Sequence, residues 1–356
     1  MPTTPTIDVI VVTWNHARFV EFMMEGLCRV EYPRDALTVH IVDNASADGS
    51  IDAVKAFIAQ HEGRLPKTLI YESGKNLGFS GGNNLIMAHS TADYVYLCNP
   101  DASFEVDTLK EVIAVAESHP NAASVQSMLV LAQDTTKLNS VGNDIQFAGF
   151  GYCRGNMDPI ANAPTEVRPI SYASGAGTLY RMSALRTIGL FDDELFAYHE
   201  DLDLGWRMMI AGYDNLIAPK SILYHHYEFP RTISKWYLME RNRGIVLLTL
   251  YQIPTLVLLL PGLIAIELAT WLFAIKGGWA DKKWRAVSWF FKGSSWRYIS
   301  KKRHEVAKLR RRGDREILKR FVAVIAHQEV ENGFVTAVAN PLMRAYITIV
   351  RAIVWW

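Results

Sequence analysis

Glu200 and Asp201 stand where the sequence predicts a helix to begin, between an aromatic loop and an apolar-periodic segment ending at Gly212. Backbone N–H groups at a helix start are free and carry partial positive charge, which keeps a nearby carboxylate ionised. Such a carboxylate can act as a general base at neutral pH when a substrate hydroxyl comes within reach. The same pattern also fits two residues that only cap the helix, with Asp203 paired to Arg207 four residues on.

Other polar side chains cluster directly after the segments that read as strands. They occur at Thr13-Trp14-Asn15, Asp43-Asn44-Ala45-Ser46, Asn76–Asn84 and Asn99-Pro100-Asp101. Parallel strands end at one edge of their sheet, and open α/β sheets bind ligands at that edge. A dinucleotide-binding dehydrogenase is not indicated, because no glycine fingerprint follows the first strand, and the glycine-rich loop expected at Asn76–Asn84, after the third strand, lacks the G-x-G-x-x-G spacing.

Strand-like and helix-like segments alternate through the first hundred residues. Helical patterns at about 17–30, 50–60 and up to about 89 separate strand-like segments at 7–12, 37–42, 68–72 and 94–98. This alternation predicts a parallel sheet joined by right-handed crossovers. Residues 132–168 are polar, glycine-dotted and aperiodic, which is typical of a long excursion that carries specificity.

The net charge of +1 conceals two oppositely charged parts of the chain. Residues 276–320 hold 16 Lys and Arg against 4 Asp and Glu, so residues 1–275 carry about −11. A basic segment on an acidic body argues for a local anionic partner such as a lipid surface or nucleic acid. Eight of the ten tryptophans follow residue 230 and no motif that reads DNA or RNA is present, so a lipid surface is favoured.

Residues 245–275 are apolar but contain Pro254, Pro261 and Glu267. A membrane-spanning helix needs about 20 uninterrupted apolar residues, and a carboxylate is costly at the bilayer centre. Because the prolines cut the run into pieces, the sequence predicts an apolar hairpin of two short helices that lie in one leaflet.

The sequence divides into an α/β domain at 1–233 and a helical region at 234–356. The helical region comprises the apolar hairpin, the basic and tryptophan-rich segment 276–320, and an amphipathic end at 341–356. Together these segments fit an interfacial surface that faces anionic lipid. The alternative is a solvated basic helix with an interface between copies of the chain.

The cysteines, Cys28, Cys98 and Cys153, are odd in number and widely spaced. This spacing argues against a disulfide framework and against a zinc site, so we expect reduced core residues in a cytosolic compartment. No basic stretch followed by a long apolar run occurs at the N-terminus, and we therefore expect no export.

Five motifs in this order and spacing resemble the family 2 inverting glycosyltransferases of the GT-A fold, particularly their rhamnosyltransferase-like branch. They are Val-Val-Thr-Trp-Asn (11–15), Val-Asp-Asn-Ala-Ser (42–46), Asn76–Asn84, Asn-Pro-Asp (99–101) and His-Glu-Asp-Leu-Asp-Leu-Gly-Trp-Arg (199–207). The resemblance covers about residues 7–245. It implies a Rossmann-like mixed sheet flanked by helices, a nucleotide-sugar donor and a divalent metal, Mg²⁺ or Mn²⁺.

The resemblance assigns donor and metal roles to residues at the strand ends. Asp101 ends a motif that looks like the family's Asp-x-Asp and is the best metal ligand, although Asn99 replaces the first aspartate and leaves one fewer charge. His225 falls where related enzymes hold a further metal ligand, with His226 and His199 less suited. The expected donor-binding residues are Thr13, Asn15, Asp43, Asn76, Gly78, Asn83, Asn99 and Asp101, of which Asp43 would bind the pyrimidine ring.

The resemblance aligns Asp201 with the catalytic base, and Glu200 would orient donor or acceptor hydroxyls. Metal charge on the leaving diphosphate and a base on the opposite face would together support direct, inverting displacement at the sugar carbon. Arg241 and Arg243 could bind the diphosphate of a lipid-linked acceptor, since guanidinium matches phosphate oxygens. The alternative for these arginines is a charged helix face at a membrane.

The resulting hypothesis is an inverting glycosyltransferase, peripheral or monotopic, on the cytoplasmic face of the cell membrane. It would move a sugar, rhamnose from dTDP-rhamnose or a sugar from a UDP donor, to a polyprenyl-diphosphate-linked saccharide. A processive synthase is disfavoured because no Gln-x-x-Arg-Trp segment follows the Glu-Asp motif. A polyprenyl-phosphate sugar synthase and a non-catalytic membrane-tethered saccharide-binding scaffold remain as alternatives.

Overall fold

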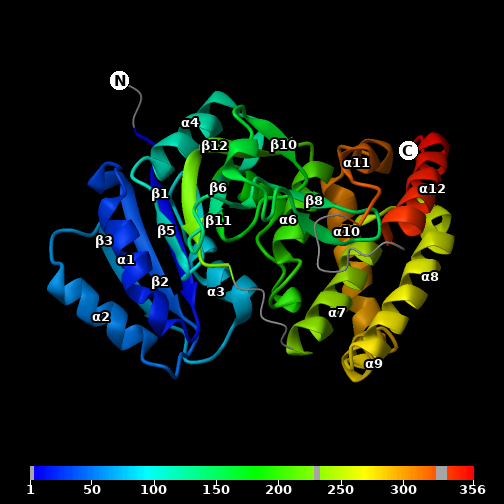
Figure 1. Ribbon diagram of the computed structural model, residues 1–356, viewed down its shortest axis with the longest axis horizontal. Helices are drawn as coiled ribbons and strands as arrows, with labels where there is room; N and C mark the ends of the chain where they lie inside the picture. The colour runs from blue at the N-terminus through cyan, green and yellow to red at the C-terminus, as the bar shows by residue number, and fades with distance from the viewer. Residues whose placement is uncertain (1–3, 228–232, 326–334) are drawn as a thin grey trace. The chain divides into compact units, whose positions relative to one another are not determined.

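The computed structural model describes residues 4–227, 233–325 and 335–356, which fold as two compact units (Figure 1). Unit 1 comprises Met1–Asn143, Cys153–Phe196 and Tyr213–Glu228. Unit 2 comprises Asp144–Tyr152, Ala197–Gly212 and Phe229–Trp356. This division differs from the expected boundary at residue 233, because the segment that carries Glu200 and Asp201 belongs to unit 2.

A mixed, ten-stranded sheet forms the centre of unit 1 within the described residues. The main path runs β10-β12-β6-β11-β4-β1-β2-β3, while β5 pairs with β12 and β7 with β6. The strands are β1 (Ile7–Thr13), β2 (Leu37–Asp43), β3 (Lys67–Glu72), β4 (Tyr94–Cys98), β5 (Ala102–Phe104), β6 (Ala122–Leu131), β7 (Leu138–Ser140), β10 (Arg168–Ile170), β11 (Gly177–Arg181) and β12 (Asp214–His225). Strands β1 to β4 pair in parallel, as the alternating pattern predicts, and β11 runs antiparallel to β4 and β6. The expected α/β class with a mixed sheet is confirmed.

Helices connect the parallel strands of unit 1. They are α1 (Val20–Arg29), α2 (Ser50–Gln60), α3 (Gly78–Met87), α4 (Thr108–Ser118) and α5 (Met182–Ile188), with 3-10 turns η1 (Ala17–Phe19), η2 (Arg34–Ala36), η3 (Ile160–Asn162) and η4 (Asp193–Leu195). The expectation that Asn76–Asn84 forms a glycine-rich loop is wrong, because α3 begins at Gly78. The Asn76 side-chain oxygen accepts the Gly78 N–H at 2.8 Å, and Gly78 has φ of +72°. Glycine permits this left-handed backbone at the helix start.

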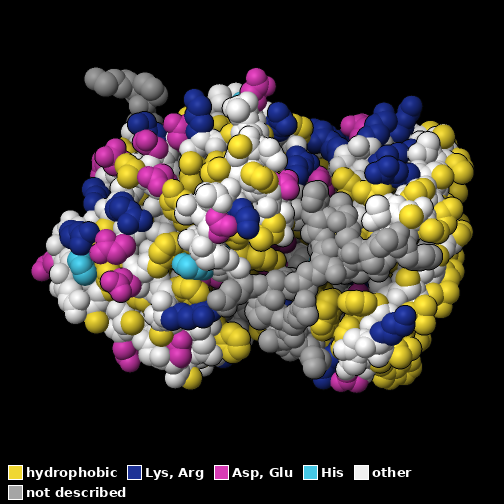
Figure 2. Space-filling view, in the orientation of Figure 1, with side chains coloured by type: hydrophobic (Ala, Val, Ile, Leu, Met, Phe, Trp, Pro, Cys, Tyr) yellow, Lys and Arg dark blue, Asp and Glu magenta, His cyan; other side chains and the backbone are white. Residues whose placement is uncertain are grey.

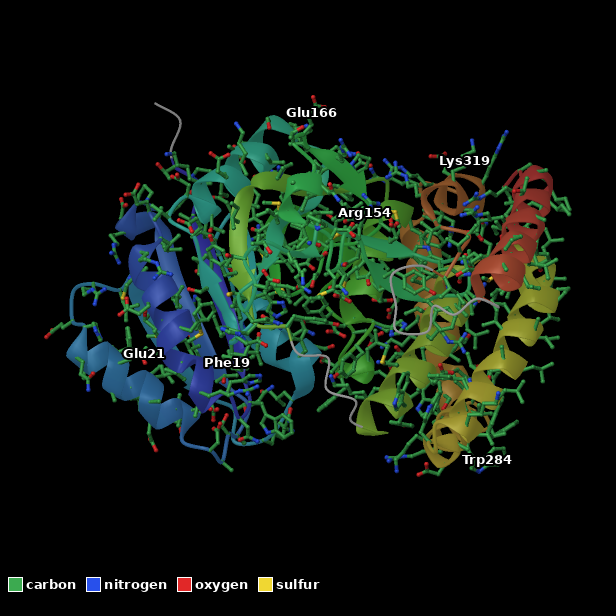
Figure 3. All side chains as sticks on the ribbon, in the orientation of Figure 1. Phe19, Glu21, Arg154, Glu166, Trp284 and Lys319 are labelled. Carbon is green, nitrogen blue, oxygen red and sulfur yellow. The ribbon has the colours of Figure 1, made fainter. Side chains whose placement is uncertain are left out.

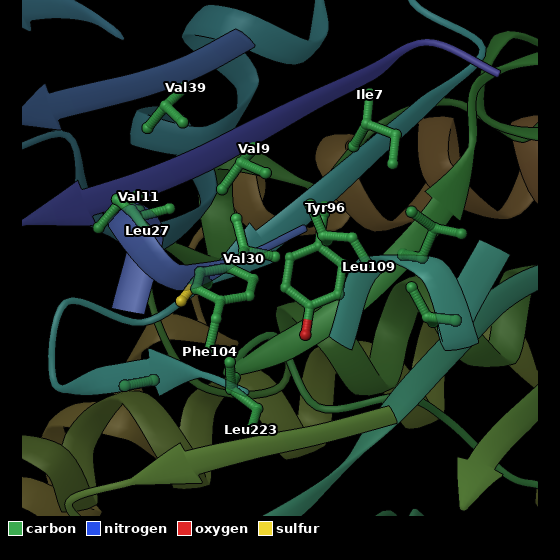
Figure 4. Close-up of a cluster of buried hydrophobic side chains, with 14 of the residues drawn as sticks. Ile7, Val9, Val11, Leu27, Val30, Val39, Tyr96, Phe104, Leu109 and Leu223 are labelled. Atoms are coloured by element: carbon green, nitrogen blue, oxygen red, sulfur yellow. The ribbon is translucent and has the colours of Figure 1, made fainter. Parts of the chain in front are cut away.

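The core of unit 1 lies between the sheet and its helices, and it joins apolar side chains from β1, β4, β5, α1 and α4 (Figure 4). Alternate residues of β1 contribute Ile7, Val9 and Val11, all of them buried. Helix α1 approaches β5 closely at Gly26, where an added Cβ would lie 2.6 Å from the Phe104 amide nitrogen. The absence of a side chain at Gly26 therefore sets the spacing between α1 and β5.

Unit 2 is predominantly helical. Its helices are α6 (Glu200–Ile210), α7 (Ile233–Leu250), α8 (Ile253–Lys276), α9 (Ala280–Trp289), α10 (Gly293–Leu309), α11 (Asp314–Arg320) and α12 (Asn340–Ile353), with a π-helical turn η5 (Val335–Ala339) and β8 (Asn143–Ile145) paired to β9 (Gly151–Cys153). Trp206 of α6 is fully buried, and its ring packs edge-on against Tyr251 and Phe321, with centroids 4.7 Å away in both pairs. The expected helical C-terminal region is confirmed, and its helices enclose α6.

The expectation of two short helices within 245–275 is wrong in two respects. The run from Ile245 to Leu250 ends α7 and lies mostly in the core of unit 2. Helix α8 then continues for 24 residues with Pro261 inside it. Pro254 occupies the first turn, where a missing N–H costs no helical hydrogen bond.

Gly26→Ala tests the close approach of α1 to β5. We expect the substitution to lower the free energy of unfolding by about 1–3 kcal/mol, because the new methyl group forces the helix away from the strand. Alanine is the better helix former, so propensity alone predicts the opposite sign. The control is Gly293→Ala at the start of α10, where nothing lies within 4 Å of an added Cβ. Equal melting temperatures for both variants in thermal unfolding would contradict this account.

Candidate active site

The ends of β1 and β2 place the first group of expected donor-binding residues side by side. Thr13 and Asp43 are register partners at the last pair of the two strands, and both are buried. The Asp43 carboxylate accepts the Ser46 N–H at 3.2 Å, which leaves acceptor capacity for a ligand N–H. Among the described residues the Thr13 hydroxyl has no hydrogen-bond partner. The side-chain oxygen of Asn15 accepts the Ala47 N–H at 2.8 Å, so Asn15 joins the two strand-end loops.

The start of α3 places Asn76, Gly78 and Asn83 beside these strand ends. The Gly78 carbonyl accepts the Asn44 side-chain N–H at 2.9 Å, and a Cβ on Gly78 would collide with the Phe196 carbonyl. Asn83 is buried and donates its amide N–H to the Phe79 carbonyl at 2.9 Å. Asn76, Gly78 and Asn83 thus shape and brace the helix start.

Asp101 and His225 meet where β4 and β12 end. The His225 Nε2 atom lies 3.2 Å from the Asp101 Oδ1 atom and 3.3 Å from the Asn99 side-chain nitrogen. The backbone holds this pair in place, since the His226 N–H donates to the Asp101 carbonyl at 2.9 Å. Burial opposes ionisation of Asp101, but positive charge at this corner, as on a protonated His225, holds the pKa of Asp101 below its ordinary value.

Asn139 determines which nitrogen of His225 carries the proton. Its side-chain oxygen, which only accepts, lies 2.9 Å from His225 Nδ1, so the proton is assigned to Nδ1. The Nε2 lone pair then faces Asn99 Nδ2 and the Asp101 carboxylate. A lone pair directed at a carboxylate oxygen that has no hydrogen-bond partner among the described residues fits a cation between them.

The donor set of this corner fits a divalent cation that is shared with a diphosphate. In the described part of the chain no group of three or more His, Cys, Asp or Glu side chains is placed to hold a metal ion. Asp101 and His225 are therefore the protein ligands on offer, and Mg²⁺ is commonly bound by one or two carboxylates together with phosphate oxygens. His226 is placed differently, with its ring 5.3 Å from Phe19 and 4.9 Å from Phe22.

Glu200 and Asp201 begin α6 in unit 2, as the sequence predicts. The residues before them are held in an unusual backbone conformation, with φ of +66° at Tyr198 and +70° at His199. Non-glycine residues in this region store strain, and neighbouring structure must hold them there. Asn242 of α7 does so by donating to the Ala197 carbonyl at 3.0 Å and to the Tyr198 carbonyl at 2.6 Å.

The two carboxyl groups at the start of α6 differ in their surroundings. Glu200 is buried, and burial together with the negative charge of Asp201 raises its pKa well above the ordinary value. Asp201 is half-buried, and its Oδ1 atom accepts the Leu202 N–H at 2.8 Å, where the helix start stabilises negative charge. A neutral Glu200 can donate a hydrogen bond, and the ionised Asp201 beside it can accept a proton.

Asp203 and Arg207 form the expected structural ion pair, with 2.7 Å between Oδ2 and both Nε and Nη2. His199 also has a packing contact, since its Nε2 atom lies 3.1 Å from the Gly149 carbonyl, and burial lowers its pKa to about 4. These intramolecular contacts give Asp203, Arg207 and His199 structural roles.

Arg241 and Arg243 are both buried in α7. Arg243 lies 2.9 Å from Glu267 and 3.1 Å from Glu240, and its guanidinium covers the Phe150 ring. Arg241 Nε donates to the Asn242 side-chain oxygen at 3.0 Å, which orients the amide that holds the Ala197–Tyr198 carbonyls. Both guanidinium groups have structural partners, so we leave them out of the proposed acceptor site.

Two residues that matter to this geometry escape sequence reasoning. Asn139 lies in the aperiodic excursion, where no periodic pattern marks one polar residue above another. Asn242 lies between two arginines whose charge draws attention instead. Each of these amides acts through its hydrogen-bond partners, and only the folded chain reveals them.

Comparison with known proteins places these features in a family. The model of "Glycosyl transferase family 2" matches residues 8–189, just over half of the chain. N-acetylglucosaminyl-diphospho-decaprenol L-rhamnosyltransferase of Mycobacterium tuberculosis is 25% identical over 251 residues, 63% of this chain and 76% of that protein. Poly-beta-1,6-N-acetyl-D-glucosamine synthase of Staphylococcus epidermidis is 19% identical over 216 residues, 61% of this chain and 48% of that protein.

Solved structures share the fold at low sequence identity. GalNAc-T7 with UDP, GalNAc and Mn²⁺ matches with a TM-score of 0.57 at 11% identity, over 70% of this chain and about half (48%) of that chain. The mannosyltransferase PcManGT of Pyrobaculum calidifontis, in complex with GDP-Man and Mn²⁺, matches with a TM-score of 0.51 at 15% identity, over 99% of this chain and 87% of that chain. The GT-A architecture is thereby confirmed, and the chain belongs to glycosyl transferase family 2 and is a glycosyltransferase.

Proposed function

We propose that this glycosyltransferase moves rhamnose from dTDP-rhamnose to a hydroxyl of a polyprenyl-diphosphate-linked saccharide, with inversion at the sugar carbon. The observation that carries the proposal is the Asp101–His225 corner, where a histidine lone pair and a carboxylate face each other at 3.2 Å. Support for the substrate class comes from the mycobacterial relative, whose name specifies rhamnose transfer to a decaprenol-diphosphate sugar.

In the proposed reaction the acceptor oxygen forms a bond to the anomeric carbon of the donor sugar. The bond from that carbon to the diphosphate oxygen breaks, and its electron pair leaves with the nucleoside diphosphate. The acceptor proton goes to the Asp201 carboxylate, and Glu200 in its protonated form donates a hydrogen bond to a sugar oxygen. Thr13 and Asp43 bind the pyrimidine base of the donor.

Asp101 and His225 would hold a Mg²⁺ or Mn²⁺ ion, whose charge neutralises the leaving diphosphate. Asn99 brings no charge to this corner, so a cation bound there would retain more positive charge for the diphosphate than it would beside two aspartates. The Asn139 side-chain oxygen keeps the Nε2 lone pair of His225 available by accepting a hydrogen bond from Nδ1–H.

We further propose that the enzyme works on the cytoplasmic face of the cell membrane, because the acceptor class is lipid-linked. The basic segment 276–320 supports this location through its attraction to anionic lipid. Donor and acceptor identity within the nucleotide-sugar and lipid-linked classes follow from the relative rather than from the geometry.

Asp201→Asn tests the proposed base. We expect kcat/KM for transfer to fall by about 10²- to 10⁴-fold, because the amide cannot accept the acceptor proton. Binding of dTDP-rhamnose, measured by the thermal stabilisation it produces, should stay unchanged. Nucleotide release is measured with dTDP- and UDP-sugars and a short-chain polyprenyl-diphosphate saccharide. The control is Asp52→Asn, an exposed carboxylate in the first turn of α2, which should retain full activity.

Other outcomes of this experiment favour the alternatives. Full activity in Asp201→Asn with a polyprenyl phosphate as acceptor favours a polyprenyl-phosphate sugar synthase, since a phosphate acceptor needs no base. Donor binding without nucleotide release in the unmodified chain, with every donor and acceptor tried, favours the scaffold reading.

Asn139→Leu tests the arrangement around His225 without relying on activity. Without the amide oxygen the His225 Nδ1–H group has lost its hydrogen-bond acceptor, so the Nε2 lone pair is no longer kept unprotonated. We therefore expect Mn²⁺ in the presence of nucleoside diphosphate to bind about 10- to 100-fold more weakly. Asn139→Asp should restore binding, because a carboxylate also accepts the Nδ1 proton. Asn162→Leu, at an exposed position of η3, serves as the control. Unchanged Mn²⁺ affinity by titration calorimetry in Asn139→Leu would contradict the assignment.

A further inference from the structure

Helix α8 exposes a continuous apolar face. Its outward residues recur every three or four positions, and each has 51% to 63% of its surface exposed: Ile253, Val257, Leu260, Ile264, Leu268 and Leu272. Helix α12 adds a second exposed apolar row beside it, consisting of Leu342, Ile349 and Ile353. Figure 2 shows hydrophobic side chains gathered along the edge formed by α8 and α12. No charged residue interrupts the α8 row, which extends about 29 Å from Ile253 to Leu272 at 1.5 Å per residue.

Among the described helices α8 alone is long and apolar enough to cross a membrane, with 24 residues and a mean hydropathy of 2.2 in its most apolar window. Length and composition therefore permit a span. The inner side of α8 decides against it.

The C-terminal half of α8 is tied to the rest of unit 2 by ion pairs between Glu267 and two buried cations. Glu267 lies 2.9 Å from Arg243 and 2.7 Å from Lys283, and Lys283 also contacts Glu240 and donates to Thr270 at 2.8 Å. The Lys283 side chain is only 1% exposed. Moving α8 away would leave buried charges without partners, which is strongly unfavourable. Glu267 thus faces cations inside unit 2.

The middle of α8 is tied to α12 through a hydroxyl group. Pro261 disturbs the helical ladder at this point. The Tyr346 hydroxyl donates to the Leu258 carbonyl at 2.6 Å and lies 3.3 Å from the Gly262 nitrogen, two groups that would bond to each other in a regular helix. An interrupted ladder is tolerated in an apolar medium when a neighbour satisfies the freed groups. Tyr346 is that neighbour, because its hydroxyl bonds to both freed groups.

The first turn of α8 is also anchored, since Trp356 donates its indole N–H to the Thr255 hydroxyl at 2.9 Å. Contacts at Thr255, Leu258 and Glu267 hold one side of α8 against unit 2 along its length. The opposite side remains apolar and exposed.

Exposed cations and a tryptophan occur on α8 and α12 and on α9 and α11, the helices that contact them. The exposed ones are Lys276 at the end of α8, Arg344 on α12, Arg315 and Lys319 on α11, and Trp284 and Arg285 on α9. Figure 3 labels Trp284 and Lys319, which project outward from α9 and α11. Tryptophan and basic side chains at the margin of an apolar surface match the interface of a bilayer with anionic headgroups.

We propose that α8 and α12 together form an in-plane membrane-binding face that inserts into one anionic leaflet, and that α8 does not span the bilayer. The proposal rests on the membrane association proposed above and specifies its surface and depth. The face inserts into the leaflet to a depth of about one helix diameter, and the surrounding cations contact the headgroups.

Flotation with phosphatidylglycerol-containing vesicles tests the face. In the double variant Ile264→Glu, Leu268→Glu we expect the apparent partition coefficient to fall at least about tenfold, because two charges enter the apolar row. The control is Met157→Glu, Ile160→Glu, which adds the same charge at exposed apolar positions of unit 1. Binding of the unmodified chain should be weaker on phosphatidylcholine vesicles and at high salt.

Nucleotide release from the donor in vesicle-free buffer reports on the active site alone. Lost flotation with intact release supports the face, whereas lost release with intact flotation counts against the proposed function and leaves the face standing. Unchanged flotation of the double variant overturns the face. If circular dichroism shows that the double variant fails to fold, Leu260→Glu and Leu272→Glu as single substitutions replace it.

Cysteine labelling tests the depth with the same full-length chain. Cysteines added one at a time at Gln252, just before α8, and at Lys276, its last residue, are exposed to a membrane-impermeant maleimide in inside-out membrane vesicles, with the unmodified chain as background. An in-plane helix labels at both ends before permeabilisation, and a spanning helix labels at one end only. Protection of one end overturns the proposal. Lipid-free dimers that the double variant disperses, with flotation unaffected, would instead assign the face to a second copy of the chain.

Discussion

Unit 2 depends on the packing of Trp206 between Tyr251 and Phe321. The indole belongs to α6, the helix that begins with Glu200 and Asp201, and the two rings come from residues more than forty positions further on. Burying such a ring supplies a large apolar area, and its loss typically costs about 3–5 kcal/mol. The far end of α6 is held as well, since the Arg311 and Arg312 N–H groups donate to the Ile210 carbonyl at 2.9 and 3.0 Å.

The carboxylates of α6 therefore share their folding unit with the C-terminal helices. Asn242 adds to this dependence by holding the strained residues that precede Glu200. A chain truncated near residue 234 would lose the partners of Trp206 and of the Ala197–Tyr198 backbone together. Separating catalysis from membrane association requires point substitutions on the exposed face instead of truncation.

Buried apolar runs and strand-end motifs made the fold of unit 1 predictable. Val9 to Val12 form a buried core strand, and Asp43 at the end of β2 and Asp101 after β4 belong to the two strands that flank β1 in the sheet. The predictions failed where a residue type that usually marks a loop or a helix end contacts a residue far away in the chain. Glycines at 78–82 read as a loop, yet close packing of Gly82 on Val12, where an added Cβ would lie 2.7 Å from the valine, builds them into α3. Pro261 reads as a helix break, yet the Tyr346 hydroxyl repairs the ladder.

The same distinction holds for the candidate site. Motif order placed Asp101 and His225 in one corner although they are 124 residues apart, because both end strands of one sheet. The order of the motifs did not predict the surroundings of either side chain. That Asn139 selects the tautomer of His225 and that Arg243 is surrounded by carboxylates depend on packing between segments with no shared periodicity. A sequence pattern reports which side chains reach an edge, while their hydrogen-bond partners depend on the folded interior.

The buried charges around Lys283 constrain how this sequence can change over evolutionary time. Glu240, Glu267, Arg243 and Lys283 form a set of two negative and two positive groups. Removing one member leaves a buried charge uncompensated, whereas replacing the whole set by apolar residues is close to neutral. Single substitutions at these positions are therefore selected against, and drift must proceed through paired replacements. Descendants of this sequence should keep all four residues or have exchanged them in charge-balanced pairs, although α7, α8 and α9 lie in separate stretches of the chain.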